Sequence, residues 1–297
     1  MLTSNGYRLD MSPHRWGELT DSTAAAGRRD HGELWQRLRA DGYLLLRDFL
    51  DRQTVLAFRR YFFGALAPTG LLAAGSDPAD GIARTDAGTD GGTDAGTDRA
   101  LLRSTLFGSV VPGAEYQRLC TDPRITGFFG WLLGTPDAHA AVHLHRRRIL
   151  RHTRPGERGV GVATQAHYDL LYLREGTDRV LSMWIPLGDC PAERGGLVYL
   201  ERSHLWVLRD EAAGQLRPAA SITADLPSLA DAHDARWLGA EFRAGDVMIH
   251  SAHIVHAATD NVDPGGVMRL STDIRYQRSS EPIDWRWQQH WHDRDGL

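Results

Sequence analysis

The feature that most constrains this chain is a His-x-Asp pair, His167 and Asp169, with a third candidate ligand far downstream at His256. In a β-strand, residues two apart point to the same side, so His167 and Asp169 can reach one metal ion from an inward-facing strand end. Two neutral imidazoles and one carboxylate form the facial ligand set typical of Fe(II). Chance His-x-Asp pairs are frequent in a chain with 14 histidines, so the interpretation depends on the surrounding motifs.

Three histidines compete for the role of third ligand, because His250 and His253 precede His256 in one apolar run. If 247–256 forms a single strand, residues 250 and 256 share a face and 253 points away. The long separation between Asp169 and this run leaves room for several intervening strands. Such a layout is that of a double-stranded β-helix, a jelly-roll barrel with the metal at its mouth.

The order of sequence patterns predicts helices first and strands afterwards. Helical spacing and capping residues indicate helices over 31–38, after Asp51 and after Asp122. Apolar runs bounded by Gly and Pro predict the strands 43–48, 141–152, 180–187, 197–200, 247–256 and 269–276. Residues 1–30 are expected to be loosely ordered. Residues 209–235 are expected to form a polar excursion. We therefore expect a mainly β fold with N-terminal helices on a double-stranded β-helix barrel, as a single domain over 1–297.

Residues 75–99 differ from the rest of the chain. A period-four repeat of Thr-Asp-Ala-Gly type runs from Thr85 to Asp98. It is acidic, rich in glycine and without large apolar residues, so it cannot bury a core. We expect a flexible surface loop; the residue order of an EF-hand calcium loop is absent.

Bulk composition excludes several functional classes. The net charge is −4, so no overall basic field favours nucleic acid or an anionic membrane. No signal peptide and no transmembrane run is visible, and Cys120 and Cys190 have neither disulfide-framework nor zinc-ribbon spacing. A cytoplasmic protein acting on a small molecule is expected. All 34 basic residues are Arg, so an anionic cofactor must be held by guanidinium groups, which grip carboxylates in a bidentate fork.

Taken together, these motifs resemble the phytanoyl-CoA dioxygenase family of Fe(II)/2-oxoglutarate-dependent oxygenases. The resemblance covers most of the chain. It rests on residues 40–50, the His167-Tyr168-Asp169 motif, Trp184-Ile185-Pro186-Leu187, the turn and strand 195–204, Gly245-Asp246 with His256 ten residues on, and the strand from Arg269 to Tyr276.

The resemblance implies a role for each matching position. His167, Asp169 and His256 would be the iron ligands, and Arg269 would bind the distal carboxylate of 2-oxoglutarate. Trp184 resembles a Trp that borders this co-substrate in some members. From their positions in the sequence, we expect Arg148 (or Arg146) to supply a second polar contact, and Gln165 to touch substrate or co-substrate or to make a structural hydrogen bond.

The implied cofactors are Fe(II), 2-oxoglutarate and O₂, and the implied reaction is oxidation, most simply hydroxylation, of an unactivated C–H bond. A bacterial natural-product substrate is expected from the composition. Ala258 stands where members often carry Ser or Gly, and the retained Asp169 argues against halogenation. A redox-neutral cupin-type enzyme remains the alternative, as do a same-family epimerase, cyclase or desaturase. The tail with Trp285, Trp287 and Trp291 is expected to pack over the barrel or to form an oligomer contact.

Overall fold

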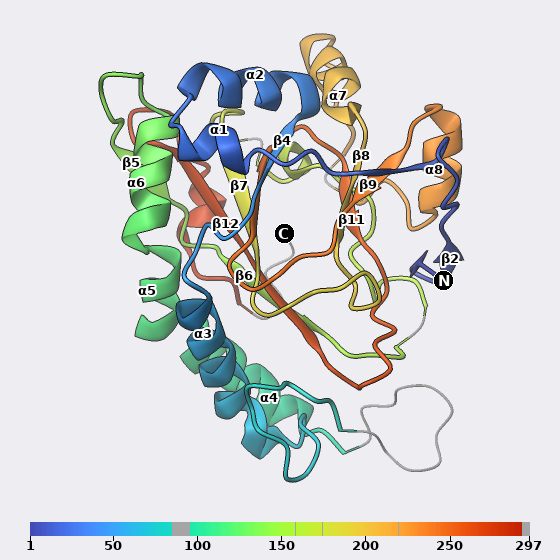
Figure 1. The fold of residues 1–297 in the computed structure, drawn as a ribbon. Helices are drawn as coiled ribbons and strands as arrows, with labels where there is room; N and C mark the ends of the chain where they lie inside the picture. The colour runs from blue at the N-terminus through green and yellow to red at the C-terminus, as the bar shows by residue number, and fades with distance from the viewer. Residues whose placement is uncertain (85–95, 158, 174, 219, 293–297) are drawn as a thin grey trace.

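The computed structural model describes residues 1–84, 96–157, 159–173, 175–218 and 220–292. Its strands form two main sheets, with most of the helices along one side of the larger sheet (Figure 1). The larger sheet has the order β4-β10-β7-β12-β5, and β6 also pairs with β12. Its strands are β4 (Tyr43–Leu46), β5 (Val142–Leu144), β6 (Ile149–Thr153), β7 (Leu181–Pro186), β10 (Val247–Ser251) and β12 (Arg269–Arg278).

The smaller sheet has the order β11-β8-β9-β3 and faces the larger one. Its strands are β11 (His256–Ala258), β8 (Leu197–Leu200), β9 (Trp237–Gly239) and β3 (Trp16–Glu18), while β1 (Thr3–Ser4) and β2 (Tyr7–Arg8) form a separate hairpin. Side chains of both sheets share one buried cluster: Tyr43 of β4 stacks on Tyr199 of β8 at 5.3 Å between ring centroids. The result is the expected mainly β architecture of two opposed, largely antiparallel sheets.

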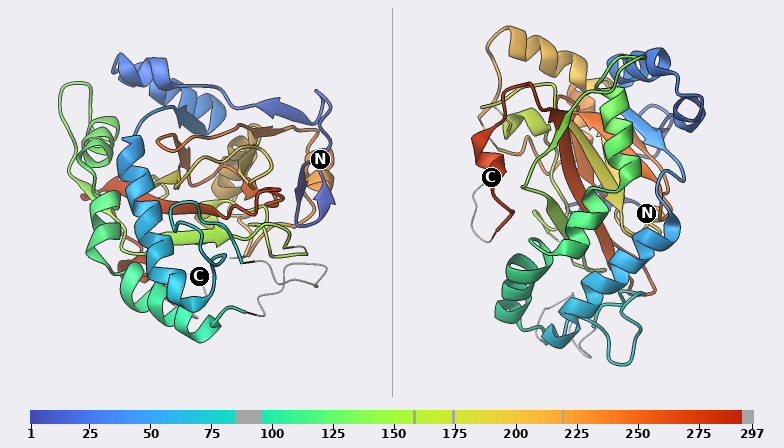
Figure 2. Two further views of the ribbon diagram at one scale, coloured as in Figure 1. Left: turned by 60° about the horizontal axis from the view of Figure 1, so that its bottom comes forward. Right: turned by 90° about the vertical axis from the view of Figure 1, so that its left-hand side faces the viewer.

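Helices cover the outer face of the larger sheet, as the right-hand view of Figure 2 shows. They are α1 (Thr23–Gly27), α2 (His31–Asp41), α3 (Arg52–Leu66), α4 (Arg99–Thr105), the π-helical η2 (Leu106–Val110), α5 (Ala114–Cys120) and α6 (Pro123–Leu132). Short 3₁₀ turns are η1 (Ala67–Thr69), η3 (Asp169–Leu171) and η4 (Trp285–Gln288), and α7 (Ser203–Ala212) and α8 (Leu226–Ala232) lie beside the smaller sheet. Asp51 caps α3 by accepting a hydrogen bond from the Thr54 amide at 2.7 Å, as predicted.

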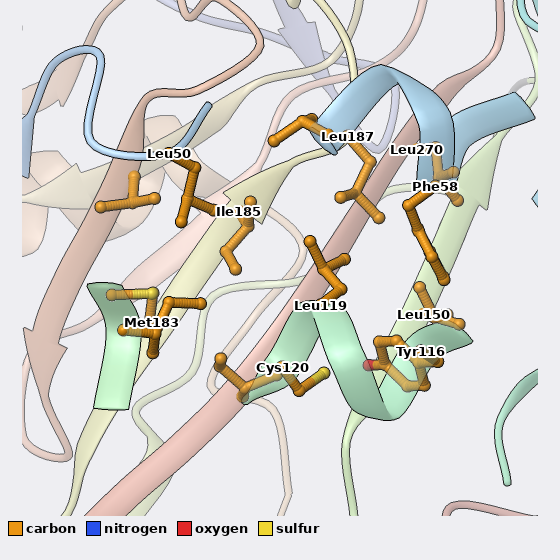
Figure 3. Close-up of a cluster of buried hydrophobic side chains, with 14 of the residues drawn as sticks. Leu50, Phe58, Tyr116, Leu119, Cys120, Leu150, Met183, Ile185, Leu187 and Leu270 are labelled. Atoms are coloured by element: carbon orange, nitrogen blue, oxygen red, sulfur yellow. The ribbon is translucent and has the colours of Figure 1, made fainter. Parts of the chain in front are cut away.

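The two faces of the larger sheet have opposite character, because side chains alternate along each strand. On the outer face, apolar residues pack against α3 and α5; Figure 3 shows Leu150, Met183, Ile185 and Leu270 among them. On the inner face of β12 the alternate residues are polar: Arg269, Ser271, Asp273 and Arg275. This alternation separates a hydrophobic layer that stabilises the fold from a polar interior that is available for chemistry.

Two predicted strands are shorter than expected. The run 141–152 breaks into β5 and β6, and at the break the Arg147 amide bonds to the carbonyl of Trp287 at 3.1 Å rather than to a strand. The run 247–256 breaks after Ser251 into a turn, so that β10 belongs to the larger sheet and β11 to the smaller one. The prediction that 250 and 256 share one strand was therefore wrong.

Other expectations need correction as well. Residues 1–30 are ordered: the Ser4 hydroxyl donates to the Ala258 carbonyl at 2.7 Å, and the Asn5 amide donates to Asp260 at 2.7 Å. The polar excursion 209–235 contains the end of α7 and all of α8, whose apolar positions the sequence analysis overlooked. Most of the acidic repeat, 85–95, lies outside the described residues. Within the described residues, no helix combines the length and the apolar character needed to cross a bilayer.

Candidate metal centre

His167, Asp169 and His256 converge although they come from distant parts of the chain. The backbones of His167 and His256 form an isolated antiparallel bridge, with N–H···O distances of 3.0 and 2.9 Å in the two directions. His256 begins β11, and Asp169 begins η3 directly after the bridge. The Nε2 atoms of His167 and His256 lie 3.9 and 4.0 Å from Oδ1 of Asp169, and one ligand atom from each residue lies within 4.8 Å of the others. Such spacing suits donors that share one ion at about 2.0–2.2 Å from each.

Each histidine is oriented by the carbonyl two residues before it. Nδ1 of His167 donates to the Gln165 carbonyl at 2.9 Å, and Nδ1 of His256 donates to the Ile254 carbonyl at 3.1 Å. A carbonyl only accepts, so the proton lies on Nδ1 and the Nε2 lone pair is left for a metal. Burial lowers the pKa of His167; burial together with His167 and His250 holds the pKa of His256 well below its usual range. Both rings are therefore neutral, as metal ligation requires.

The carboxylate of Asp169 is held from behind. Nε and Nη2 of Arg275 donate to its two oxygens at 3.1 and 3.0 Å, and the Ser182 hydroxyl donates to Oδ2. Burial opposes ionisation of Asp169, but Arg275, with help from His250 and His256, holds the pKa of this carboxyl well below its usual range. The third ligand is thus ionised and fixed in orientation without a metal.

His250 approaches the other oxygen of this carboxylate. Its Nε2 is 3.7 Å from Oδ2 of Asp169, whereas the two triad histidines approach Oδ1. Its Nδ1 is 2.9 Å from the hydroxyl of Tyr199, and its ring centroid is 4.6 Å from that of His256. His250 therefore lies next to the ligand set. His253 points elsewhere and pairs with Glu211 at 2.8 Å.

A small inner cavity of about 40 Å³ adjoins the triad. It is lined by both triad histidines together with Trp184, Arg269, Ser271 and neighbouring residues. Nε of Arg269 and Oγ of Ser271 are buried, and neither has a hydrogen-bond partner in the part of the chain that the structure describes. Burial lowers the pKa of Arg269, but a guanidinium remains charged at neutral pH. An unsatisfied buried cation beside a metal centre fits the distal carboxylate of a dicarboxylic acid.

An outer pocket of about 230 Å³ opens on the other side of His167 and Asp169. Its walls include Gln165, Arg151, Tyr172 and Trp287. Of the residues expected near the co-substrate, Gln165 therefore lines this pocket. A larger cavity of about 850 Å³ lies between the N-terminal segment and the smaller sheet, and its lining includes none of the three triad residues.

Arg148 does not reach either pocket at the triad, which corrects the expectation for this residue. Its guanidinium lies over the ring of Tyr116 at 4.9 Å, and Nη1 donates to the side chain of Gln117 at 2.6 Å, both on α5. Arg148 precedes Leu150 by two residues and shares its face, which points to the helices, whereas Arg151 points to the metal centre. Arg148 thus lies on the face that meets the helices and not on the face that meets the metal centre.

The comparison with family models agrees with this geometry. A model described as Phytanoyl-CoA dioxygenase (PhyH) matches residues 38–269. The chain belongs to this family. Comparison with curated protein sequences gave no match. Solved structures of the same fold cover 84–96% of the chain in the cases below.

This phytanoyl-CoA dioxygenase family member is similar to the alpha-ketoglutarate-dependent epimerase SnoN from nogalamycin biosynthesis. The two chains are 23% identical, with a TM-score of 0.52, and the match covers 86% of this chain and 85% of that one. The carbocyclase SnoK, also from nogalamycin biosynthesis, gives 22% identity and 0.53, with 84% and 85% coverage. EctD from S. alaskensis, with 2-oxoglutarate and 5-hydroxyectoine, gives 20% and 0.54, with 96% and 89% coverage. These likenesses confirm the double-stranded β-helix fold.

Some solved structures of the same fold contain iron or 2-oxoglutarate. One SnoN structure contains Fe3+ and alpha ketoglutarate, and one EctD structure contains bound Fe. In the present chain, the donor types of the His-Asp-His set suit a metal ion, and the guanidinium of Arg269 in the inner cavity suits a carboxylate.

Sequence reasoning missed Arg275 and Ser182, the two residues that orient Asp169. Arg275 carried a usable signal, since it follows Arg269 by six residues on one predicted strand and therefore shares its face. Ser182 pairs with Arg275 in register on the neighbouring strand β7. That register depends on tertiary structure, so nothing in the sequence predicts it.

Proposed function

We propose that the protein is an Fe(II)- and 2-oxoglutarate-dependent dioxygenase that oxidises, most simply by hydroxylation, an unactivated C–H bond of a small molecule. The observation that carries the proposal is that two sites adjoin. One is a preformed His-Asp-His set, and the other is a cavity lined by Arg269, whose Nε has no partner among the described residues. When bound, iron, 2-oxoglutarate and O₂ supply the oxidising power, with release of succinate and CO₂.

The protein's own contribution is positioning and exclusion of water. His167 and His256 present Nε2 lone pairs, and Asp169 presents an ionised oxygen. Arg269 would hold the distal carboxylate of the co-substrate, with Trp184 beside it in the cavity wall. Because Trp184 and His256 are almost fully buried, the co-substrate would be shielded from bulk water. The outer pocket would hold the substrate over the same metal.

The reactions possible within this class differ in the product that they form. Neighbours of the same fold include an epimerase and a carbocyclase from nogalamycin biosynthesis, and we extend to this chain the proposal of a role in bacterial natural-product biosynthesis. Hydroxylation adds one oxygen atom to the substrate, desaturation or ring closure removes two hydrogens, and epimerisation leaves the mass unchanged. Mass spectrometry of the product separates these outcomes.

Anaerobic titration with Fe(II) and 2-oxoglutarate tests the proposal directly. The wild-type protein should develop the weak visible charge-transfer band of a chelated 2-oxo acid, and His256→Ala should lose it. His14→Ala changes an exposed histidine far from the triad in sequence and should retain the band. Activity that needs neither O₂ nor 2-oxoglutarate would instead support the redox-neutral cupin-type alternative.

A further inference from the structure

The outer pocket contains one guanidinium, that of Arg151, for which no described residue supplies an ion-pair partner. Arg275 and the carboxylate of Asp169 also line the pocket, and they are paired with each other through two hydrogen bonds. The chain as a whole has a net charge of −4, so an arginine at this place does not reflect a generally basic protein.

Arg151 lies at the junction of the two cavities. It lines both the outer pocket and the inner cavity, and its strand partner in β12 is Ser271. Among the described residues its side chain makes no hydrogen bond and no ion pair. Asp273, which also lines the inner cavity, forms no ion pair with it within 4.0 Å. An open guanidinium beside a metal centre is a binding group without a ligand.

A carboxylate of the co-substrate could supply the negative charge opposite Arg151, but the proposed function already assigns the distal carboxylate to Arg269. Arg269 lines the inner cavity and not the outer pocket, whereas Arg151 faces the outer pocket as well. The guanidinium of Arg147 lies over the ring of Trp287 at 4.7 Å, and both residues line the outer pocket. Arg151 is therefore the arginine of the outer pocket that is open to a ligand and separate from Arg269.

We propose that the substrate is a small carboxylic acid whose carboxylate is bound by Arg151, while the carbon to be oxidised lies over the metal between His167 and Asp169. The proposal deepens the proposed function and rests on it. The planar fork of Arg151 matches the two oxygens of a carboxylate. At about 230 Å³ the pocket is smaller than the roughly 300–1,000 Å³ typical of drug-sized ligands, which favours a compact acid.

The test compares matched ligands and matched variants. A panel of small carboxylic acids, each paired with its primary amide, is added to the anaerobic Fe(II)–2-oxoglutarate protein, and binding is followed by ligand-observed NMR and by the shift of the charge-transfer band. Acids should bind and stimulate succinate release, and their amides should not. Arg151→Gln should weaken binding of the acid about 30-fold or more, and should abolish the preference for acid over amide.

Two controls separate Arg151 from general effects. Arg146→Gln removes an exposed arginine from the same segment, which lines neither pocket, and should leave acid binding unchanged. Titration of 2-oxoglutarate without substrate should give the same affinity in Arg151→Gln and wild type. If that affinity falls while the acid-over-amide preference persists, Arg151 serves the co-substrate and the proposal is wrong.

Two further outcomes are equally decisive. Substrates that prove neutral or cationic, with binding unaffected by Arg151→Gln, would overturn the carboxylate assignment while the oxygenase assignment stands. Conversely, absence of the charge-transfer band in wild type, with acids still binding in an Arg151-dependent way, would overturn the oxygenase assignment and support the anionic ligand.

Discussion

At the scale of single residues, the metal centre depends on groups that touch no metal. Asp169 is ionised and oriented because Arg275 donates to both of its oxygens and Ser182 donates to one. The triad histidines are oriented by the carbonyls of Gln165 and Ile254. Partners of this kind typically change metal affinity 10–100-fold when removed.

Arg275→Gln should therefore weaken Fe(II) binding by about one to two orders of magnitude. Since Arg275 is a main cause of the depressed pKa of Asp169, its loss should raise that pKa, and metal affinity should begin to fall at a higher pH than in wild type. Arg275→Lys keeps the charge without the fork and should restore the affinity in part. Metal titrations between pH 5 and 8, roughly the physiological range of histidine titration, provide the measurement; equal affinities in all three proteins would contradict the argument.

At the scale of elements, the two faces of β12 have different roles: one packs in the hydrophobic core, and the other lines the inner cavity. Ile274 is fully buried in the hydrophobic layer against the helices, while Ser271 lines the inner cavity. The strand therefore offers a matched pair of substitutions a few residues apart.

Ile274→Ala should lower the free energy of unfolding by about 2–5 kcal/mol, because it leaves a cavity in a packed core. Its affinity for 2-oxoglutarate should be unchanged. Ser271→Ala should behave in the opposite way, with stability close to that of wild type and weaker binding of the co-substrate. Denaturant unfolding and co-substrate titration measure the two quantities, and a correlated loss of both in either variant would show that the faces are not independent.

The elements also show how far the sequence predicts the structure. Helices with clear caps, such as α3 after Asp51 and α6 after Asp122, could be predicted because local hydrogen bonds determine where they begin. The His-x-Asp spacing and Arg269 likewise carry a local pattern. What failed depends on long-range contacts: alternation along β6 was visible, but only the docked helices reveal that Leu150 faces them and Arg151 faces the metal centre.

Strand breaks were hidden for the same reason. The apolar run 247–256 has no Gly or Pro, and its interruption after Ser251 arises because its two halves pair with opposite sheets. The break places His250 on β10 and His256 on β11, each next to a different oxygen of the Asp169 carboxylate. The sequence therefore predicts that His167, Asp169 and His256 come together, although the strand that it predicts for His256 is wrong.

At the scale of the whole molecule, buried neutral histidines link stability to pH. His145 is completely buried, and burial lowers its pKa from 6.5 to about 4, with a partly opposing hydrogen bond to Gln277 at 2.8 Å. Between these two pH values the unfolded chain binds a proton that the folded chain does not. The contribution of His145 to the free energy of unfolding is therefore complete above about pH 6.5, and it decreases as the pH falls toward 4.

The loss attributable to His145 over this window is roughly 3 kcal/mol at most. His145→Gln should flatten the decline in the free energy of unfolding between pH 6.5 and 4, measured by denaturant titration of the metal-free protein. His14→Gln, at an exposed position, should leave the slope as in wild type. A slope that is identical in all three proteins would contradict the assignment.

The backbone bridge between His167 and His256 has a consequence for how the protein acquires its metal. Because the two segments already exchange main-chain hydrogen bonds, the ion does not have to draw separate parts of the chain together. Iron should therefore bind to a preformed site without rearrangement of the backbone. We expect rapid single-phase uptake and nearly superimposable circular dichroism spectra before and after iron is added.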